Sequence, residues 1–309
     1  MALRYLMKTK PPKRPINGIL LLDKPQGLSS NKALKKVQYL FSAKKAGHTG
    51  SLDPLATGVL PICLGEATKL SQYLLDADKS YSVTAVLGQR TSTADAEGEI
   101  ISEKPVPVLS VPAIEKALDN FRGEIEQTAP SYSALKFQGK PLYEYARAGI
   151  EVAPKIRRVR INELRLISFS ENQLRLEVQC SKGTYIRSLV DDLGELLGCG
   201  AHVSELRRTK AASYEIESCL SLEALEQASD PSEPAALDHF LLPMSSALPH
   251  WPTLSLRDEE IVNFQHGRAL KLSISSPNTR VKVCDTKGNL LGLGEVVDSI
   301  NLAPKKVFN

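Results

Sequence analysis

The sequence predicts an α/β protein with two domains, and three observations support this fold class. Segments in which apolar side chains alternate with period two, such as 81–89, are interspersed with segments of helical spacing, such as 184–197. Five prolines fall within 230–252 and mark a linker. From residue 253 onward short strand-like segments are separated by turn signals, a pattern typical of a small β-barrel. With 309 residues, 42% of them hydrophobic, the chain can form one large and one small core.

The first half of the chain is predicted to begin with a buried strand and a helix that Ser29 or Ser30 caps. Apolar runs and helical spacing predict the later elements. These are a strand at 16–22, a helix ending near 41, a loop at 47–58, a strand at 59–64, a helix at 66–77, a strand at 81–89 and a helix at 111–121. Residues 94–100 are predicted to form a loop or a hairpin tip, with Glu97-Gly98 as the turn signal.

The second half is predicted to have two strands within 162–180 and a helix at 184–197, followed by a strand at 201–208 and a helix at 220–227. Arg187 lies in the first turn of the helix 184–197, where a positive charge opposes the helix dipole. An arginine in that position is expected to pair with a nearby acid, although an ordinary surface arginine is the alternative. Turn signals in the last domain are expected at 265–267, 277–278, 287–289 and Gly292/Gly294.

The segment 47–58 has three glycines, one imidazole, His48, and one carboxylate, Asp53. Glycines allow tight turns and close approach of a ligand, and Pro54 stiffens the backbone after the acid. The segment is therefore expected to be a rigid loop that presents one acid. Taken alone, an Asp-Pro pair more often makes a simple turn.

As a whole, this segment resembles the catalytic motif of the TruB family of pseudouridine synthases. The segments 17–27, 78–81, 131–136 and 181–187 resemble the same family. The resemblance runs from about residue 16 to the C-terminus and is strongest up to about residue 208. It implies a pseudouridine synthase fold with a mixed, mainly antiparallel central sheet in a catalytic domain at 16–250. It also implies an RNA-binding thumb insertion at 127–159, less ordered than the core without RNA, and a PUA-like RNA-binding domain at 251–309.

The resemblance also implies the chemistry, which is the isomerisation of uridine 55 in the T-arm of tRNA. Asp53 is the implied nucleophile, attacking either C1′ of the ribose or C6 of the base, and the sequence does not decide between them. Arg187 is expected to lie beside Asp53 and to lower its pKa. Tyr81 is expected to stack on the flipped uracil and to handle a proton. Without the family, Tyr81 would be interpreted as an ordinary strand aromatic.

The remaining implied site residues bind the substrate or support the loop. Tyr185 and Leu206 are expected to line the base pocket, and His48 to contact neighbouring nucleotides. Lys24 and Pro25 are expected to brace the catalytic loop. Leu206 taken alone would be assigned to the core.

Two segments are strongly basic and indicate a polyanionic partner. Residues 1–15 have five basic and no acidic side chains, and 136–160 has seven basic against two acidic. The first is predicted to be a disordered tail. In the second, interleaved aromatic residues favour contact with looped RNA, although a hairpin packing its own aromatics is the alternative.

Composition and motifs exclude several classes of function. Phosphate-loop, dinucleotide, zinc and serine-hydrolase motifs are absent from the sequence, so neither cofactor nor metal is expected. The five cysteines are expected to be reduced, and neither a membrane span nor a secretory signal is predicted. We expect a cytoplasmic monomer that binds tRNA without an obligatory protein partner. A guide-RNA-dependent synthase and an RNA chaperone that binds and folds tRNA are the alternatives.

Overall fold

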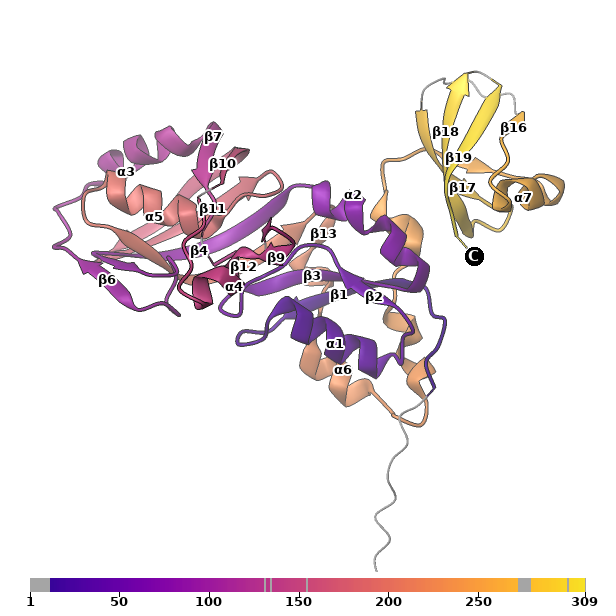
Figure 1. The fold of residues 1–309 in the computed structure, drawn as a ribbon, viewed down its shortest axis with the longest axis horizontal. Coiled ribbons are helices and arrows are strands. Elements are labelled where there is room, and N and C mark those ends of the chain that lie inside the picture. Colours follow the sequence, from indigo (N-terminus) through magenta and orange to yellow (C-terminus); the bar gives the residue numbers. More distant parts are fainter. Residues whose placement is uncertain are drawn as a thin grey trace, which may run out of the picture.

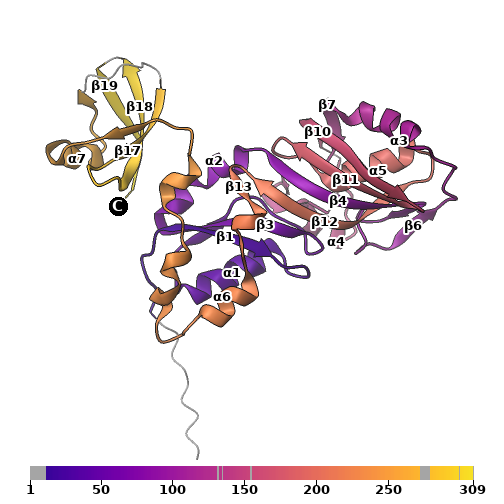
Figure 2. The same cartoon turned by 180° about the vertical axis from the view of Figure 1, so that it is seen from behind.

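The computed structural model describes residues 12–130, 132–133, 135–153, 155–271, 279–298 and 300–308. A large domain is built on a long twisted sheet, and a small β-domain lies beside one end of it (Figure 1). The same arrangement seen from behind places the two domains at opposite ends of the molecule (Figure 2). The described part of the chain contains no helix long and apolar enough to cross a membrane.

The central sheet has ten strands within the described residues, and eight of them follow one path. In spatial order these are β14 (Leu220–Ser221), β1 (Gly18–Lys24), β3 (Thr57–Leu64), β12 (Ala201–Ala211), β4 (Lys79–Leu87), β11 (Gln173–Cys180), β10 (Ile156–Ser170) and β7 (Gly123–Thr128). β13 (Tyr214–Glu215) pairs with β12, and β2 (Ala46–His48) pairs with β3. The pairs β1–β14 and β3–β12 are parallel and the others are antiparallel, which confirms the predicted mixed, mainly antiparallel sheet.

Helices cover the sheet and close two hydrophobic clusters. α1 (Ser30–Leu40) and α6 (Leu222–Ala228) pack together over β1 and β3, whereas α3 (Val111–Leu118) and α5 (Ile186–Leu196) pack over the strands around β4 and β11. Ser29 caps α1 by accepting a hydrogen bond from the Lys32 amide at 3.3 Å, as predicted. The predicted helix at 66–77 divides into a 3₁₀ turn, η1 (Gly65–Leu70), and a short helix, α2 (Ser71–Asp76).

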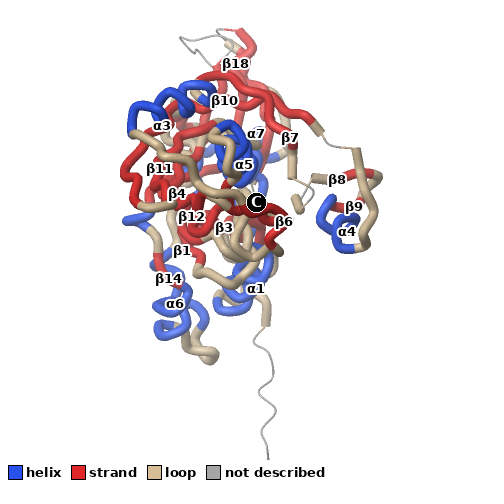
Figure 3. The backbone as a smooth tube through the Cα atoms, turned by 90° about the vertical axis from the view of Figure 1, so that its left-hand side faces the viewer, coloured by secondary structure: helices blue, strands red, loops and turns tan. Residues whose placement is uncertain are grey.

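Two hairpins leave the sheet. β5 (Gln89–Thr91) and β6 (Ile100–Glu103) form the hairpin expected around Glu97-Gly98. β8 (Lys136–Phe137), β9 (Lys140–Pro141) and α4 (Leu142–Arg147) project from the side of the sheet (Figure 3). The ends of the predicted thumb, 127–128 and 156–159, lie within β7 and β10, because side chains such as Val159 are buried in the core. The part that leaves the sheet is therefore 129–155.

The segment predicted as a linker packs against the large domain. It contains two 3₁₀ turns, η4 (Pro234–Phe240) and η5 (Met244–Ala247). Leu237 is fully buried against the α1–α6 cluster, and Leu242 forms a bridge with Ile19 of β1. Its apolar side chains therefore make it part of the fold rather than a free connection.

The small domain is a five-stranded sheet in the order β15-β17-β18-β19-β16, curled into a half-barrel. Its strands are β15 (Thr253–Ser255), β16 (Leu270–Lys271), β17 (Thr279–Cys284), β18 (Leu290–Asp298) and β19 (Asn301–Val307). It also contains a helix that was not predicted, α7 (Asp258–Gln265). Gly292 and Gly294, which were expected to mark a turn, lie inside β18. A side chain would collide with Phe264 at the first position and with Leu302 at the second. The expected turn at 277–278 lies outside the described residues.

The two domains share an apolar contact. Phe308 and Leu293 belong to the same buried cluster as Leu21 and Val59, with Trp251 packed against it. The Lys306 ammonium lies 5.1 Å from the centre of the Tyr73 ring. In the predicted tail, residues 1–11 lie outside the described residues, but Arg14 is ordered by main-chain bonds to Ser42 and Lys44 and an ion pair with Asp238.

Candidate active site

Asp53 lies on a loop between two strands that are paired with each other. Gly47 and His48, which were predicted to belong to the loop, lie in β2 opposite Cys63 and Ile62 of β3. The loop itself spans 49–56, since β3 begins at Thr57. At Gly58, φ is +104° and a Cβ atom would lie 2.1 Å from the Arg208 carbonyl oxygen, so this position requires glycine.

Three contacts hold the loop against the start of α1. The Leu52 amide donates a hydrogen bond to Ser30 Oγ at 2.7 Å, and the Ser30 hydroxyl in turn donates to the Leu52 carbonyl oxygen at 3.0 Å. The Gly27 amide donates to the Pro54 carbonyl at 2.8 Å. The residues on both sides of Asp53 are therefore bonded to the turn and helix that follow β1.

Lys24 supports that turn from beneath. Its side chain is fully buried, and its ammonium donates to the carbonyls of Pro25 at 2.8 Å and Leu28 at 2.6 Å. Burial lowers the pKa of Lys24 to about 8, against the opposing attraction of the Asp53 carboxylate. Lys24 thus braces the turn that the catalytic loop packs against, through the carbonyls of Pro25 and Leu28.

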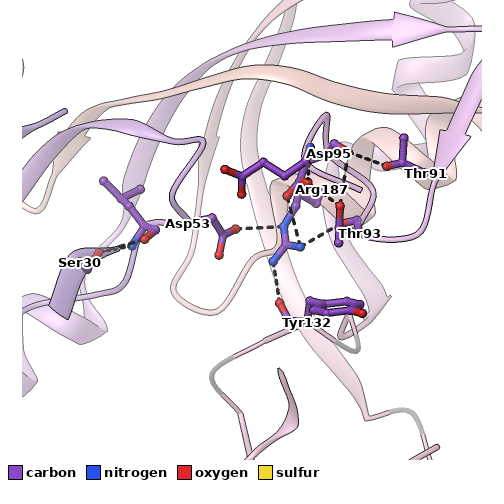
Figure 4. Close-up of polar contacts among 9 residues, drawn as sticks. Ser30, Asp53, Thr91, Thr93, Asp95, Tyr132 and Arg187 are labelled. Carbon is purple, nitrogen blue, oxygen red and sulfur yellow. Dashed lines mark hydrogen bonds and ion pairs between the residues drawn. The ribbon is translucent and has the colours of Figure 1, made fainter. Parts of the chain in front are cut away.

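Arg187 is the centre of a polar network around Asp53 (Figure 4). Its guanidinium is almost fully buried, with Nε 3.0 Å from Asp53 Oδ2 and Nη1 3.5 Å from Asp95 Oδ2. Nη1 also donates to the Thr93 carbonyl at 2.9 Å, and Nη2 to the Tyr132 carbonyl at 2.8 Å. The pairing of Arg187 with an acid, expected from its place at the start of α5, is present.

Asp95 was not singled out from the sequence. It lies in the β5–β6 hairpin with only 4% of its side chain exposed. Its carboxylate accepts hydrogen bonds from the Thr93 hydroxyl and from the Glu97 amide, the latter at 3.1 Å. Arg187 therefore bridges two carboxylates, and no local pattern identified the second because it comes from a hairpin distant in sequence.

Burial raises the pKa of Asp53 above its ordinary value of 3.8, and Arg187 and Lys24 oppose this while Asp95 adds to it. The Asp53 side chain is nonetheless 42% exposed, since one side of it faces a cavity. Arg187 does lower the pKa of Asp53, as expected, but desolvation raises it by more, so the net shift is upward.

The cavity beside Asp53 has a volume of about 270 Å³. Its lining includes Tyr81 from β4, Tyr185 just before α5, Arg187 and Leu206 from β12. Burial raises the pKa of Tyr81, so its hydroxyl is neutral near pH 7. A carboxylate, aromatic faces and an apolar side chain thus surround a space suited to one nucleobase.

His48 does not line this cavity, and its Nδ1 is buried without a hydrogen-bond partner among the described residues. Burial lowers the pKa of His48, and the charge of Arg208 lowers it further, so the ring is neutral near pH 7. Arg208, which sequence reasoning missed, is 1% exposed and donates to the carbonyls of Val59 at 2.7 Å and Gly50 at 3.1 Å. It ties β12 to the start of the catalytic loop at Gly50 and to β3, the strand that follows the loop, at Val59.

A second cavity, of about 670 Å³, lies between the projecting segment and the β5–β6 hairpin. Arg90 and Asp191 line it and pair with each other at 2.8 Å, and it contains none of the predicted site residues. Among the described residues, no cluster of three histidine, cysteine or acidic side chains is placed to hold a metal ion.

Three family models match the chain. Residues 38–186 match "TruB family pseudouridylate synthase (N terminal domain)", 187–249 match "tRNA pseudouridylate synthase B C-terminal domain", and 252–308 match "Pseudouridine synthase II TruB, C-terminal". Proteins named tRNA pseudouridine synthase B are similar over nearly the full length. The one from Coxiella burnetii (strain RSA 493 / Nine Mile phase I) is 50% identical, covering 96% of both chains. The one from Escherichia coli O1:K1 / APEC is 52% identical, covering 95% of this chain and 96% of its own.

Solved structures share the fold. A chain in a Cbf5-Nop10-Gar1 complex is 26% identical with a TM-score of 0.71, covering 94% of this chain and 85% of its own. A chain in an H/ACA ribonucleoprotein bound to a substrate RNA containing 2′-deoxyuridine gives a TM-score of 0.72 at 24% identity, with the same coverage.

Proposed function

The chain belongs to the TruB family of pseudouridine synthases, and from this premise we propose that it converts uridine 55 in the T-arm of tRNA to pseudouridine. The observation that carries the proposal is a single carboxylate, Asp53, at the wall of a cavity sized for one base and paired with a buried arginine. The curated relatives named tRNA pseudouridine synthase B support tRNA as the substrate.

The reaction breaks the N1–C1′ bond and joins the ring to C1′ through C5. The proton on C5 leaves and N1 gains a proton, so the isomerisation is redox-neutral. The uridine lies inside a folded loop and must first be flipped into the cavity. Tyr81 stacks on the base, while Tyr185 and Leu206 enclose it.

Asp53 is the nucleophile in this proposal, and its ionised form is the reactive one. Arg187 favours the charged form of that carboxylate against the opposing effect of burial, and orients it through the 3.0 Å contact. Asp95 in turn balances the charge of the buried arginine. The attack is directed at C1′ or C6, and both atoms belong to a nucleoside held in the same cavity.

The projecting segment 129–155 is proposed to close on the T-arm, and His48 to contact nucleotides beside the flipped base. The exposed side chains of Lys136, Lys140 and Lys155 in the projecting segment are proposed to contact phosphates, whereas Arg158 of β10 pairs with Glu126. The small C-terminal domain is proposed to be a PUA-like RNA-binding module.

We propose further that the protein works in the cytoplasm as a monomer without an obligatory protein partner. A guide-RNA-dependent synthase is the alternative, because the fold is shared with chains of ribonucleoprotein complexes. Conversion of a bare T-arm hairpin by the purified protein distinguishes the two. Absence of conversion until a guide RNA is added would favour the alternative.

The direct test is Asp53→Asn, with pseudouridine measured by nucleoside chromatography of a T-arm hairpin. We expect binding of the hairpin to be retained and isomerisation to be abolished, since the amide is nearly isosteric but not nucleophilic. Turnover near the wild-type rate would remove Asp53 from the role of nucleophile. Comparing tRNA folding by the wild type and this variant tests an additional chaperone role.

A further inference from the structure

Gln127 is a buried side chain outside the cavity whose amide binds the main chain of a single cavity residue. It is the penultimate residue of β7 and is 1% exposed. Its Nε2 donates to the Tyr185 carbonyl oxygen at 3.2 Å, and its Oε1 accepts from the Tyr185 amide at 3.0 Å. The side chain thus pairs with Tyr185 as a neighbouring β-strand would.

Tyr185 lies just before the first residue of α5, and no strand of the described residues pairs with it. It occupies the N-cap position in an extended conformation, and its side chain makes no capping bond. Its carbonyl also accepts the first helical bond, from the Leu189 amide at 3.1 Å. The path of the chain into α5 is therefore set by Gln127.

Two functional side chains depend on that path. The Tyr185 ring lines the cavity, and Arg187, two residues further on, reaches Asp53 with Nε at 3.0 Å. A second bond between the same elements, Ser188 Oγ to the Thr128 carbonyl at 2.9 Å, holds the next turn but not Tyr185 itself. Removing the Gln127 amide would free Tyr185 while leaving the body of the helix attached.

We propose that Gln127 is a positioning residue for the isomerisation, holding Tyr185 against the flipped base and Arg187 against Asp53. The inference rests on the proposed function. Gln127 does not line the cavity beside Asp53, and it acts through the main chain of Tyr185. Because β7 leads directly into the projecting segment 129–155, the same amide also links the root of that segment to the catalytic arginine.

The test is Gln127→Met, which keeps the length and apolar volume of the side chain but removes both hydrogen bonds. Gln38→Met is the matched control, because Gln38 also donates to a main-chain carbonyl, that of Ala43 at 3.2 Å, far from the cavity. For the wild type and both variants we would measure the single-turnover rate on an unmodified tRNA transcript and the Kd of the protein for that transcript. If the wild type does not convert the transcript, the proposed function fails. If the wild type converts it, the rates of the variants test the role of Gln127 alone.

We expect Gln127→Met to slow the single-turnover step by about 10- to 100-fold, since ~1 Å of misplacement can cost about 100-fold in rate. Its Kd for tRNA should change less than about threefold, and Gln38→Met should change neither quantity. A rate within twofold of the wild type would overturn the inference, as would a rate loss fully explained by weaker binding. If the Met variant does not fold, Gln127→Glu, which keeps the acceptor for the Tyr185 amide but lacks the donor, is judged by the same criteria.

Discussion

Replacing Ser30 by alanine should slow isomerisation because it loosens the loop that holds Asp53. The substitution leaves the catalytic side chains themselves unchanged. Among the described residues, the Ser30 hydroxyl is the side-chain group that hydrogen-bonds Leu52, the residue before Asp53, and it pairs with both the amide and the carbonyl of that residue. Ser30 is 2% and Leu52 6% exposed, so water cannot easily replace the lost bonds. Each buried polar group left unpaired lowers the free energy of unfolding by about 1–3 kcal/mol. We expect a loss in the upper part of this range because the amide and the carbonyl of Leu52 both lose their partner.

The neighbouring Ser29→Ala variant is the matched control. Ser29 caps α1 through a 3.3 Å bond at an exposed position, so its loss should cost about 1 kcal/mol of stability without moving the loop. Urea unfolding gives the stability of each variant, and single-turnover conversion of a T-arm hairpin gives the rate. We expect Ser30→Ala to lose about 10-fold or more in rate, since ~1 Å of misplacement can cost about 100-fold. Equal rates for the two variants would refute this account of how Asp53 is positioned.

Three further results are expected. Burial raises the pKa of Asp53, and the ionised form is the nucleophile, so kcat/KM should fall as the pH is lowered, with a midpoint above 3.8. A midpoint at or below 3.8 would contradict the electrostatic argument. Gly58→Ala should prevent correct folding or lower the Tm sharply, because the new Cβ would lie 2.1 Å from the Arg208 carbonyl oxygen; a wild-type Tm would show that β3 and β12 can separate there. The Kd for tRNA should rise steeply with salt as phosphate contacts release counterions, and a flat dependence would count against the basic segments as contact surfaces.

Much of the fold follows from local patterns in the sequence. The alternation at 81–89 corresponds to β4, and the helical spacing at 184–197 corresponds to α5. Errors arose where long-range burial decided the outcome. The proline-rich segment 230–252 was predicted as a linker, but buried side chains such as Leu237 attach it to the large domain.

In the candidate site, too, local sequence patterns identified some residues and long-range packing decided the others. Asp53 was identified because the glycine-rich segment around it resembles the TruB catalytic motif, and the same resemblance placed Arg187 beside that acid. The position of Arg187 at the start of a helix, where its charge opposes the helix dipole, indicated only that it pairs with some acid. Ser30 was considered only as a helix cap, whereas its hydroxyl in fact reaches Leu52. Asp95 carries no local signal, and its approach to Arg187 depends on how the β5–β6 hairpin folds back.

By itself the sequence determined the family, the order of most strands and helices, and the acid at the centre of the proposed chemistry. These properties are encoded in residue spacing and in motifs that act over a few neighbouring positions. Only the tertiary structure decided which groups surround that acid and whether burial or a neighbouring cation dominates its pKa. The physical reason is that desolvation and ion pairing depend on distances between segments remote in the chain, which the packing of the sheet and helices sets.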